Sequence, residues 1–267
     1  MADSGSTQAD PAGTSGEVLP RQVAELAGDL SEARSTSRRR EITAAIARLA
    51  GRGGRLTWTG VQAGGRATWT GTRAGGRRLT AEVLAMAPRL PVRDQQVLRA
   101  QFPGLGPDGL ADALIHGAAR ASGGVGAAVG AAMVLPFIPA APVEIAVETL
   151  ALVGIELKLI AELHEVYGLR APGSRVERMV TYIGAWAHRR GVGLAPGELV
   201  LAVGSPLWRR LERRLLARAG RSATSLGPLL TGAAAGALLN RRETRKLGHD
   251  IRNDLRKRSP HPASWPT

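Results

Sequence analysis

The alternation of hydrophobic and polar positions divides much of the chain into segments of helical length. Apolar residues repeat at the three-to-four-residue spacing of a helix face. Typical helix starts precede several of these segments: Asp108 as an N-cap, Ser174 and Glu177 as a capping box, and Ser205 with Pro206. We therefore expect an all-α fold, a helical bundle, with helices over residues 108–120, 143–167, 174–190, 206–219 and 241–258.

Two long stretches, residues 121–143 and 222–240, carry no charge and are rich in Gly and Ala. Prolines at positions 136, 139 and 142 cannot lie in one regular helix, so the chain must turn there. This predicts a Gly/Ala-rich helical hairpin in which helix 108–135 packs antiparallel on helix 143–167 through its Gly/Ala face, at Gly126 and Gly130. Small residues let two helix backbones approach closely. The predicted helix-packing positions are Gly124, Gly126, Gly130, Gly232 and Gly236.

The sequence allows this hairpin to lie either in a membrane or in a soluble protein. Its uncharged helical part before Pro136 is roughly 22 Å long, whereas the hydrocarbon core of a bilayer is about 30 Å thick. A straight span is too short, and the apolar residues favour insertion only marginally. The sequence is compatible with a re-entrant or protein-packed hairpin, with a soluble helical core, and with helices that span a membrane.

An internal repeat lies in the arginine-rich segment 34–100. TWTGVQAGGR at residues 57–66 recurs eleven residues later as TWTGTRAGGR. Eleven residues make three turns of a helix, so Trp58 and Trp69 fall on one stripe. We expect a long amphipathic N-terminal helix with a cationic flank. Glycines in the repeat each weaken a helix by about 1 kcal/mol, which leaves two short strands over the TWT segments as an alternative.

Composition and charge change along the chain. Residues 1–33 are acidic and rich in Gly, Ser, Thr and Pro in their first half, which predicts a mostly disordered tail. A basic amphipathic helical segment over residues 34–100 follows. A helical domain is expected over residues 101–258, and residues 259–267 form a tail.

The overall composition narrows the class of protein. Hydrophobic residues make up 44% of the chain and aromatic residues 3%, and Ala, Val and Leu suit closely packed helices. The joint excess of Arg, Ala and Gly is typical of a high-GC bacterial genome. The chain has no cysteine, which excludes disulfides and thiolate metal sites. Its first twenty residues lack the basic start and apolar core of a signal peptide, so we expect a cytoplasmic location.

Part of the chain, about residues 108–258, resembles the EcsC-like family. The resemblance rests on the Gly/Ala run from Gly117 to Gly130, the proline turn 136–142 with Glu144, and Tyr167-Gly168. Ile160-Ala161 belongs to the same central block, and Pro228, Gly232-Ala233, Gly236 and Asn240 are similar to the family's C-terminal Gly/Ala motif. Glu144 stands where an aspartate is more usual. The resemblance implies a helical, membrane-associated bacterial protein, and the family offers no established catalytic residues.

Helix 143–167 offers a candidate metal site. Five of its charged residues fall within an arc of about 100°: Glu144, Glu148, Lys158, Glu162 and Glu165. Metal-binding bundles place Glu-x-x-His on facing helices, and His164 follows Glu162 by only two residues. We therefore interpret this face as solvated or salt-bridged, with Lys158 reaching Glu162. We predict no metal or other cofactor, and the chain lacks the usual phosphate-loop and hydrolase motifs.

The net charge of +14 points to an anionic partner. We predict a non-catalytic scaffold or accessory protein, peripheral or re-entrant at the cytoplasmic side of the cell membrane, with anionic lipid as its partner. A protein partner is compatible with this role. The alternatives are a non-specific nucleic-acid-binding protein and an unrecognised membrane-linked enzyme. The predicted membrane or anion contacts are Trp58, Trp69, Arg66, Arg73, Arg77, Trp208, Arg209, Arg210, Arg213 and Arg214.

Overall fold

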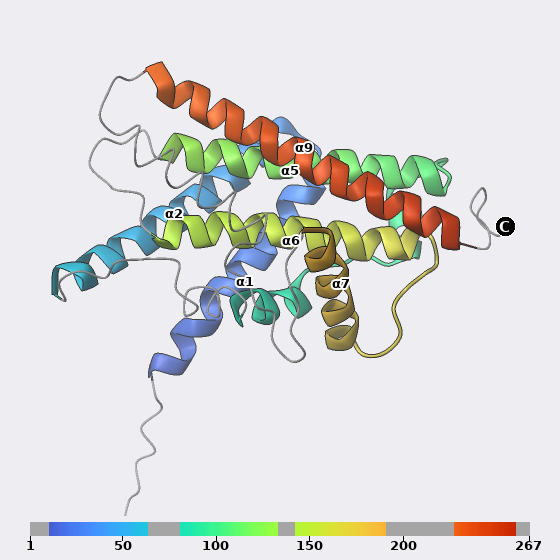
Figure 1. The fold of residues 1–267 in the computed structure, drawn as a ribbon, viewed down its shortest axis with the longest axis horizontal. Helices are drawn as coiled ribbons and strands as arrows, with labels where there is room; N and C mark the ends of the chain where they lie inside the picture. Colours follow the sequence, from blue (N-terminus) through green and yellow to red (C-terminus); the bar gives the residue numbers. More distant parts are fainter. Residues whose placement is uncertain (1–10, 64–80, 133–141, 191–226, 260–267) are drawn as a thin grey trace, which may run out of the picture.

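The computed structural model describes residues 11–63, 81–132, 142–190 and 227–259. All regular secondary structure in these ranges is helical, which confirms the predicted all-α fold (Figure 1). Besides a short helix over residues 81–86, the described elements are α1 (Pro11–Glu32), α2 (Thr36–Ala63), η1 (Ala87–Arg89), α4 (Gln95–Gln101), α5 (Pro107–Ala132), α6 (Pro142–Val166), α7 (Arg175–Arg190) and α9 (Gly227–Arg258).

Three long helices, α5, α6 and α9, lie side by side (Figure 1). Helix α5 runs antiparallel to both α6 and α9 (Figure 1). The C-terminal end of α5 therefore lies at the same end of the bundle as the N-terminal ends of α6 and α9. Helices α1 and α2 pack against α5 and α6 from another side, and α7 packs on α6.

Helix α6 is the central element. It contacts α1, α2, α4, α5, α7 and α9, and residues 153–163 are all buried. A helix surrounded in this way is apolar on nearly every face, as the run LALVGIELKLIAEL over residues 150–163 is. Its charged residues must therefore be compensated inside the protein.

Helices α5 and α9 pack closely on each other. A Cβ placed at Gly126 would lie 2.8 Å from Asn240 Nδ2 and 3.1 Å from the Gly236 carbonyl oxygen. The predicted antiparallel arrangement of α5 and α6 is present, but the partner predicted for this glycine was wrong. Gly126 faces α9 because α9 also offers small residues, and two small-residue surfaces allow the shortest distance between backbones.

The acidic N-terminal segment is more ordered than the sequence suggested. Pro11–Glu32 is helix α1, and Val23, Ala27 and Leu30 are buried in the core. Residues 19–32 of the expected disordered tail therefore belong to a packed helix. Average composition hides the apolar positions, which share one face at spacings of four and three residues. Residues 1–10 lie outside the described ranges.

Helix starts agree with the local signals in one case and differ in another. The Ser174 amide donates to Glu177 Oε2 (2.6 Å) and the Glu177 amide donates to Ser174 Oγ (3.4 Å), which is the predicted capping box of α7. Asp108 is not an N-cap, because α5 already begins at Pro107 and Asp108 lies in its first turn. Its carboxylate accepts a hydrogen bond from the Tyr167 hydroxyl (2.7 Å) instead.

The repeat is only partly within the described residues. Its first TWT segment, residues 57–59, is helical in α2, so the strand alternative was wrong for this copy. The second copy and the predicted helix 206–219 lie outside the described ranges. None of the described helices has the length and apolar character needed to cross a membrane.

Candidate functional site

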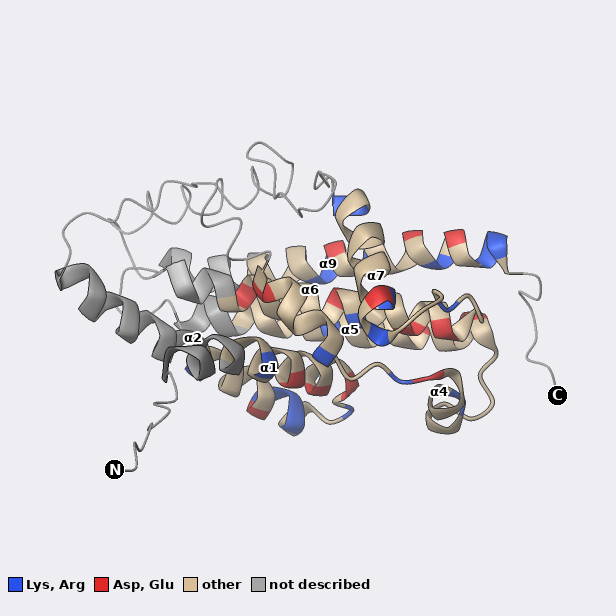
Figure 2. Ribbon diagram, turned by 90° about the horizontal axis from the view of Figure 1, so that it is seen from below, with Lys and Arg blue, Asp and Glu red and all other residues tan. Residues whose placement is uncertain are grey.

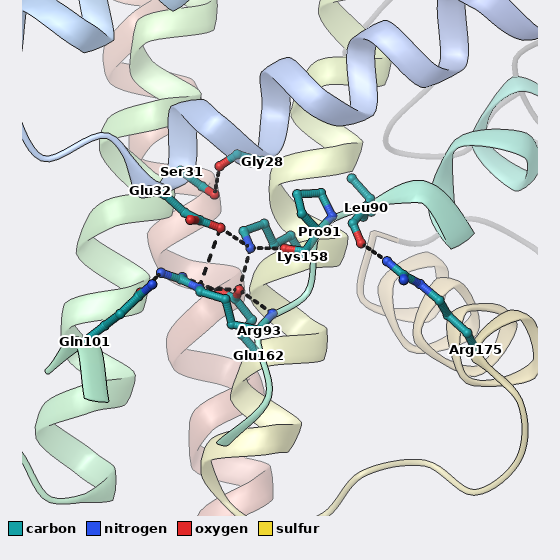
Figure 3. Close-up of polar contacts among 10 residues, drawn as sticks. All are labelled: Gly28, Ser31, Glu32, Leu90, Pro91, Arg93, Gln101, Lys158, Glu162 and Arg175. Carbon is teal, nitrogen blue, oxygen red and sulfur yellow. Dashed lines mark hydrogen bonds and ion pairs between the residues drawn. The ribbon is translucent and has the colours of Figure 1, made fainter. Parts of the chain in front are cut away.

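A pocket of about 290 Å³ opens between the C-terminal end of α1, the segment 93–102, α5 and α6. Its floor is made by a group of four charged residues that we call the Glu162 cluster: Glu32, Arg93, Lys158 and Glu162. These residues come from α1, from the segment before α4, and from α6 (Figure 3). The pocket is the candidate functional site because it joins buried charge to an accessible cavity.

Lys158 is the most deeply buried charged residue of this cluster. Its side chain is 1% exposed, and Nζ donates to Glu162 Oε1 at 2.5 Å, to the Pro91 carbonyl and to Glu32 Oε1 at 2.8 Å (Figure 3). An ammonium group has three donors, so all three are used. Pro91 can come this close because Gly28 of α1 lacks a side chain, and a Cβ there would lie 2.3 Å from Pro91 Cγ.

Arg93 closes the cluster from the other side. Its Nε and Nη2 donate to the two oxygens of Glu162 at 2.8 and 2.7 Å, and its Nη1 donates to Gln101 Oε1 at 2.7 Å. Burial lowers the pKa of Arg93, but the hydrogen bond and charge of Glu162 outweigh it, and the pKa is raised overall. Two cations thus balance two carboxylates within the cluster.

The upper part of the pocket has a different character. Arg34 donates from Nη2 to the Gln101 carbonyl (2.9 Å), and its guanidinium lies 5.5 Å from the centre of the Phe102 ring. His116 and Arg120 line the pocket from one face of α5. Neither Arg34 nor Arg120 forms an ion pair with any residue that the structure describes.

A second buried group lies on another face of α6. We call it the Glu156 cluster: Ser122, Glu156, Trp186, Arg190 and Thr244. Glu156 accepts hydrogen bonds from Trp186 Nε1 (2.8 Å), from Thr244 Oγ1 (2.9 Å) and from Arg190. The Thr244 hydroxyl also lies 2.9 Å from Ser122 Oγ. The Glu156 carboxylate therefore connects α6 to α7 and α9, and Thr244 extends the network to α5.

The C-terminal end of α6 carries further polar contacts. Glu165 accepts two hydrogen bonds from Arg170, at 2.6 and 2.7 Å. His164 Nδ1 lies 2.8 Å from the Ile160 carbonyl, and its ring packs 4.7 Å from the Tyr182 ring. Burial lowers the pKa of His164. Burial, followed by the hydrogen bond to Asp108, raises the pKa of Tyr167 above its usual value.

The predicted carboxylate face of α6 is corrected in one respect. The ion pair between Lys158 and Glu162 is present, but the two side chains are buried and not solvated. The sequence contained a signal for this, since both charges interrupt an apolar run, and a charge in such a run needs an internal partner. Within the described residues, no group of three or more His, Asp or Glu side chains is placed to hold a metal ion.

The predicted membrane contacts are mostly beyond the described ranges. Trp58 lies in the helical backbone of α2. The residues outside the described ranges are Trp69, Arg66, Arg73, Arg77, Trp208, Arg209, Arg210, Arg213 and Arg214. Sequence reasoning missed the pocket residues Arg34, Arg93 and Arg120, which carry no motif of their own.

The predicted packing glycines fall on two helices. Gly126 and Gly236 lie at the contact between α5 and α9, and a Cβ at Gly124 would meet Thr43 Oγ1 of α2 at 3.4 Å. Gly130 and Gly232 lie in the helical backbones of α5 and α9, respectively. Two of the five glycines are thus brought together by the fold.

We compared the chain with protein-family models, with curated proteins and with solved structures, and none of them matches it.

Proposed function

We propose that this protein is a non-catalytic scaffold or accessory factor that binds the anionic cytoplasmic surface of the cell membrane. The observation that carries the proposal is the separation of charge along the central bundle. Residues 121–132 of α5 and 227–240 of α9 contain no charged residue, and both segments lie at the same end of the bundle. The start of α6 at this end carries Glu144 and Glu148, so the uncharged segments are those of α5 and α9. Such segments are suited to contact with the apolar part of a lipid surface.

The charged half of the bundle lies at the opposite end. Charged residues are frequent on α9 from Arg241 to Arg258, and α5 carries Asp108, Asp112 and Arg120 in its first half (Figure 2). They are compensated there by ion pairs between helices, such as Arg252 with Asp112 and Arg256 with Asp108. The uncharged segments of α5 and α9 thus differ from the charged segments of the same two helices. Much of the α5 segment is buried, whereas Leu238 and Leu239 of α9 are exposed.

The boundary between the two halves has the composition of an interfacial helix. Leu238 and Leu239 are 65% and 49% exposed, and the exposed Arg241 and Arg242 follow after the buried Asn240. Neither arginine has an ion-pair partner among the described residues. Exposed leucines beside unpaired arginines suit the boundary between acyl chains and anionic headgroups.

Other elements of the chain support the same role. The Trp-Gly repeat and the segment 206–219 combine tryptophan with clustered arginine, as interfacial segments often do. Membership of the EcsC-like family, which would imply membrane association, stays a prediction.

The proposal is tested by co-sedimentation of the full chain with vesicles. One set contains phosphatidylglycerol and phosphatidylcholine, and the other contains phosphatidylcholine alone. We expect binding to the anionic vesicles. The double variant Arg241→Glu/Arg242→Glu should weaken it at least about tenfold, because each near-surface arginine contributes about 1 kcal/mol. The matched control Lys246→Glu/Lys257→Glu changes the charge equally on the other part of α9 and should bind nearly as wild type.

A second pair of variants tests the apolar contact. Leu238→Glu/Leu239→Glu should reduce binding, whereas Val176→Glu/Val180→Glu should not. The two valines are 55% and 53% exposed on α7, so they match the leucines in exposure but not in position. Equal binding to neutral vesicles, or no vesicle binding together with tight binding of duplex DNA, would reject the proposal and favour the nucleic-acid alternative.

A further inference from the structure

We propose that the pocket above the Glu162 cluster binds a small organic phosphate monoester. This site is independent of the proposed membrane surface, because it lies in the charged half of the bundle. The inference rests on the charge balance inside the pocket, on the way Arg34 is held, and on the apolar residues of its wall.

The charge balance leaves two arginines without counter-charges. Lys158 and Arg93 are matched by Glu32 and Glu162 at the floor. Glu32 is 34% exposed, but its Oε1 already bonds to Lys158 at 2.8 Å. Arg34 and Arg120 line the same pocket and add two uncompensated positive charges. A phosphate monoester carries a charge of about −1.5 to −2 near neutral pH, which matches them.

The guanidinium group of Arg34 is held in an orientation that suits anion binding. The hydrogen bond from Nη2 to the Gln101 carbonyl and the nearby Phe102 ring fix the plane of the guanidinium. Nε and Nη1 bond to no group in the described part of the chain. A guanidinium held in one plane with free donors suits an oxyanion, because less rotational freedom is lost on binding.

Arg120 adds donors from α5, and His116 lines the pocket beside it. They are four residues apart, so they lie on the same face of the helix. His116 Nδ1 is 2.9 Å from the Asp112 carbonyl oxygen, so Nδ1 carries the proton and donates to that carbonyl, and Nε2 of the neutral ring is an acceptor. Gly117 lies next to His116, and a Cβ there would be 3.2 Å from the Ser31 carbonyl. The absence of a side chain at this position brings α5 close to the end of α1.

The remaining wall is apolar, which favours an organic phosphate over the inorganic ion. Phe102, Leu114, Ile155 and Leu159 line the pocket beside the charged groups. A volume of about 290 Å³ is at the small end of ligand sites, so the organic part must be short. Soluble metabolites and the headgroup of phosphatidate share this phosphate monoester chemistry.

Isothermal titration calorimetry of the full chain with hexyl phosphate tests the site. We expect measurable binding, weaker binding of inorganic phosphate and none of hexanol. Arg34→Gln and Arg120→Gln should each weaken binding about tenfold, since each removes a charge-assisted contact. Arg40→Gln is the matched control: Arg40 is exposed on α2, does not line the pocket, and its loss should not change binding. Thermal melts of all variants show whether they are folded.

Vesicles distinguish a lipid headgroup from a soluble metabolite as the ligand. One set contains phosphatidate, and the diester control contains phosphatidylglycerol. Binding to phosphatidate that depends on Arg34 and Arg120 supports a lipid headgroup, whereas binding of hexyl phosphate alone supports a soluble ligand. The proposal is overturned if hexyl phosphate does not bind, if the folded Arg34→Gln and Arg120→Gln variants bind as wild type, or if hexanol or inorganic phosphate binds as tightly. None of these results depends on whether Leu238 and Arg241 contact a membrane.

Discussion

The Glu156 and Glu162 clusters place the same residue type on the same helix, six residues apart, and use it differently. Glu156 meets one arginine and two neutral donors, and the donors come from α7 and α9. Glu162 meets two cations and lies at the floor of a pocket. The residues are about 120° apart around α6, so they face different neighbours. Surroundings, and not residue type, decide whether a buried carboxylate ties helices together or forms part of a site.

The comparison also shows where each cluster is vulnerable. Arg190 has a second acceptor in Glu243 at 3.0 Å, so the Glu156 cluster retains one ion pair if Glu156 loses its charge. In the Glu162 cluster, loss of that carboxylate leaves Lys158 and Arg93 with Glu32 alone. The cost of an unpaired buried charge should therefore be larger around Glu162.

The largest effect is expected for Glu162→Gln. This change keeps the size of the side chain but leaves two cations beside one partly exposed carboxylate. We expect the free energy of unfolding to fall by about 3–5 kcal/mol, measured by urea unfolding. Glu25→Gln serves as the control, because Glu25 forms an exposed ion pair with Arg21 and its loss should change stability by less than about 1 kcal/mol. Equal effects of the two variants would show that Lys158 is not buried as described.

A smaller loss is expected for Glu156→Gln. The amide oxygen can still accept a hydrogen bond from Trp186 or Thr244, and Arg190 keeps Glu243. The expected loss is about 1.5–3 kcal/mol, since hydrogen bonds to a charged group become neutral ones. A loss equal to or larger than that of Glu162→Gln would reverse the proposed order of the two clusters.

Gly126→Ala tests the helix contact that supports the Glu156 cluster. Gly126 lies one turn from Ser122 on α5, and Asn240 lies one turn from Thr244 on α9. The added Cβ would be 2.8 Å from Asn240 Nδ2, so α9 must move away. We expect a loss of about 1–2 kcal/mol in thermal or urea unfolding.

The control for this variant is Gly109→Ala on the same helix. Its Cβ would meet Leu105 Cδ2 at an ordinary 3.6 Å, and alanine is a better helix former than glycine. This variant should be neutral or slightly stabilising. If both alanines stabilise the protein, α5 and α9 are not in close contact at Gly126.

The smallest effect concerns His164, the histidine of α6, which belongs to neither cluster. Burial lowers its pKa in the folded protein below the ordinary 6.5. The unfolded chain therefore binds a proton more readily as the pH falls through and below 6.5. The contribution of His164 to the free energy of unfolding is therefore fully present above pH 6.5. It is lost as the pH falls toward the lower pKa of the folded protein. Urea unfolding at several pH values should show this slope, and His164→Phe should reduce it; an unchanged slope would assign it to other groups.

Local features were accessible from the sequence, whereas contacts between distant segments were not. The capping box of Ser174 and Glu177 and the start of α6 near Pro142 follow from residues within a few positions of each other. The pair Lys158–Glu162 was also predicted, because its members are four residues apart. Its burial was not, because Glu32 and Arg93 come from other parts of the chain.

The sequence by itself determined the all-α class, the chain reversal between α5 and α6, and the start of α7. These follow from helix periodicity, proline geometry and capping, which are local properties. Only the tertiary structure decided that Gly126 faces α9, that the acidic N-terminal segment contributes Leu30 to the core, and that a buried ion cluster lies beneath a pocket lined by Arg34 and Arg120. Each of these depends on which helix faces approach one another, and many helix pairs satisfy the same local pattern equally well.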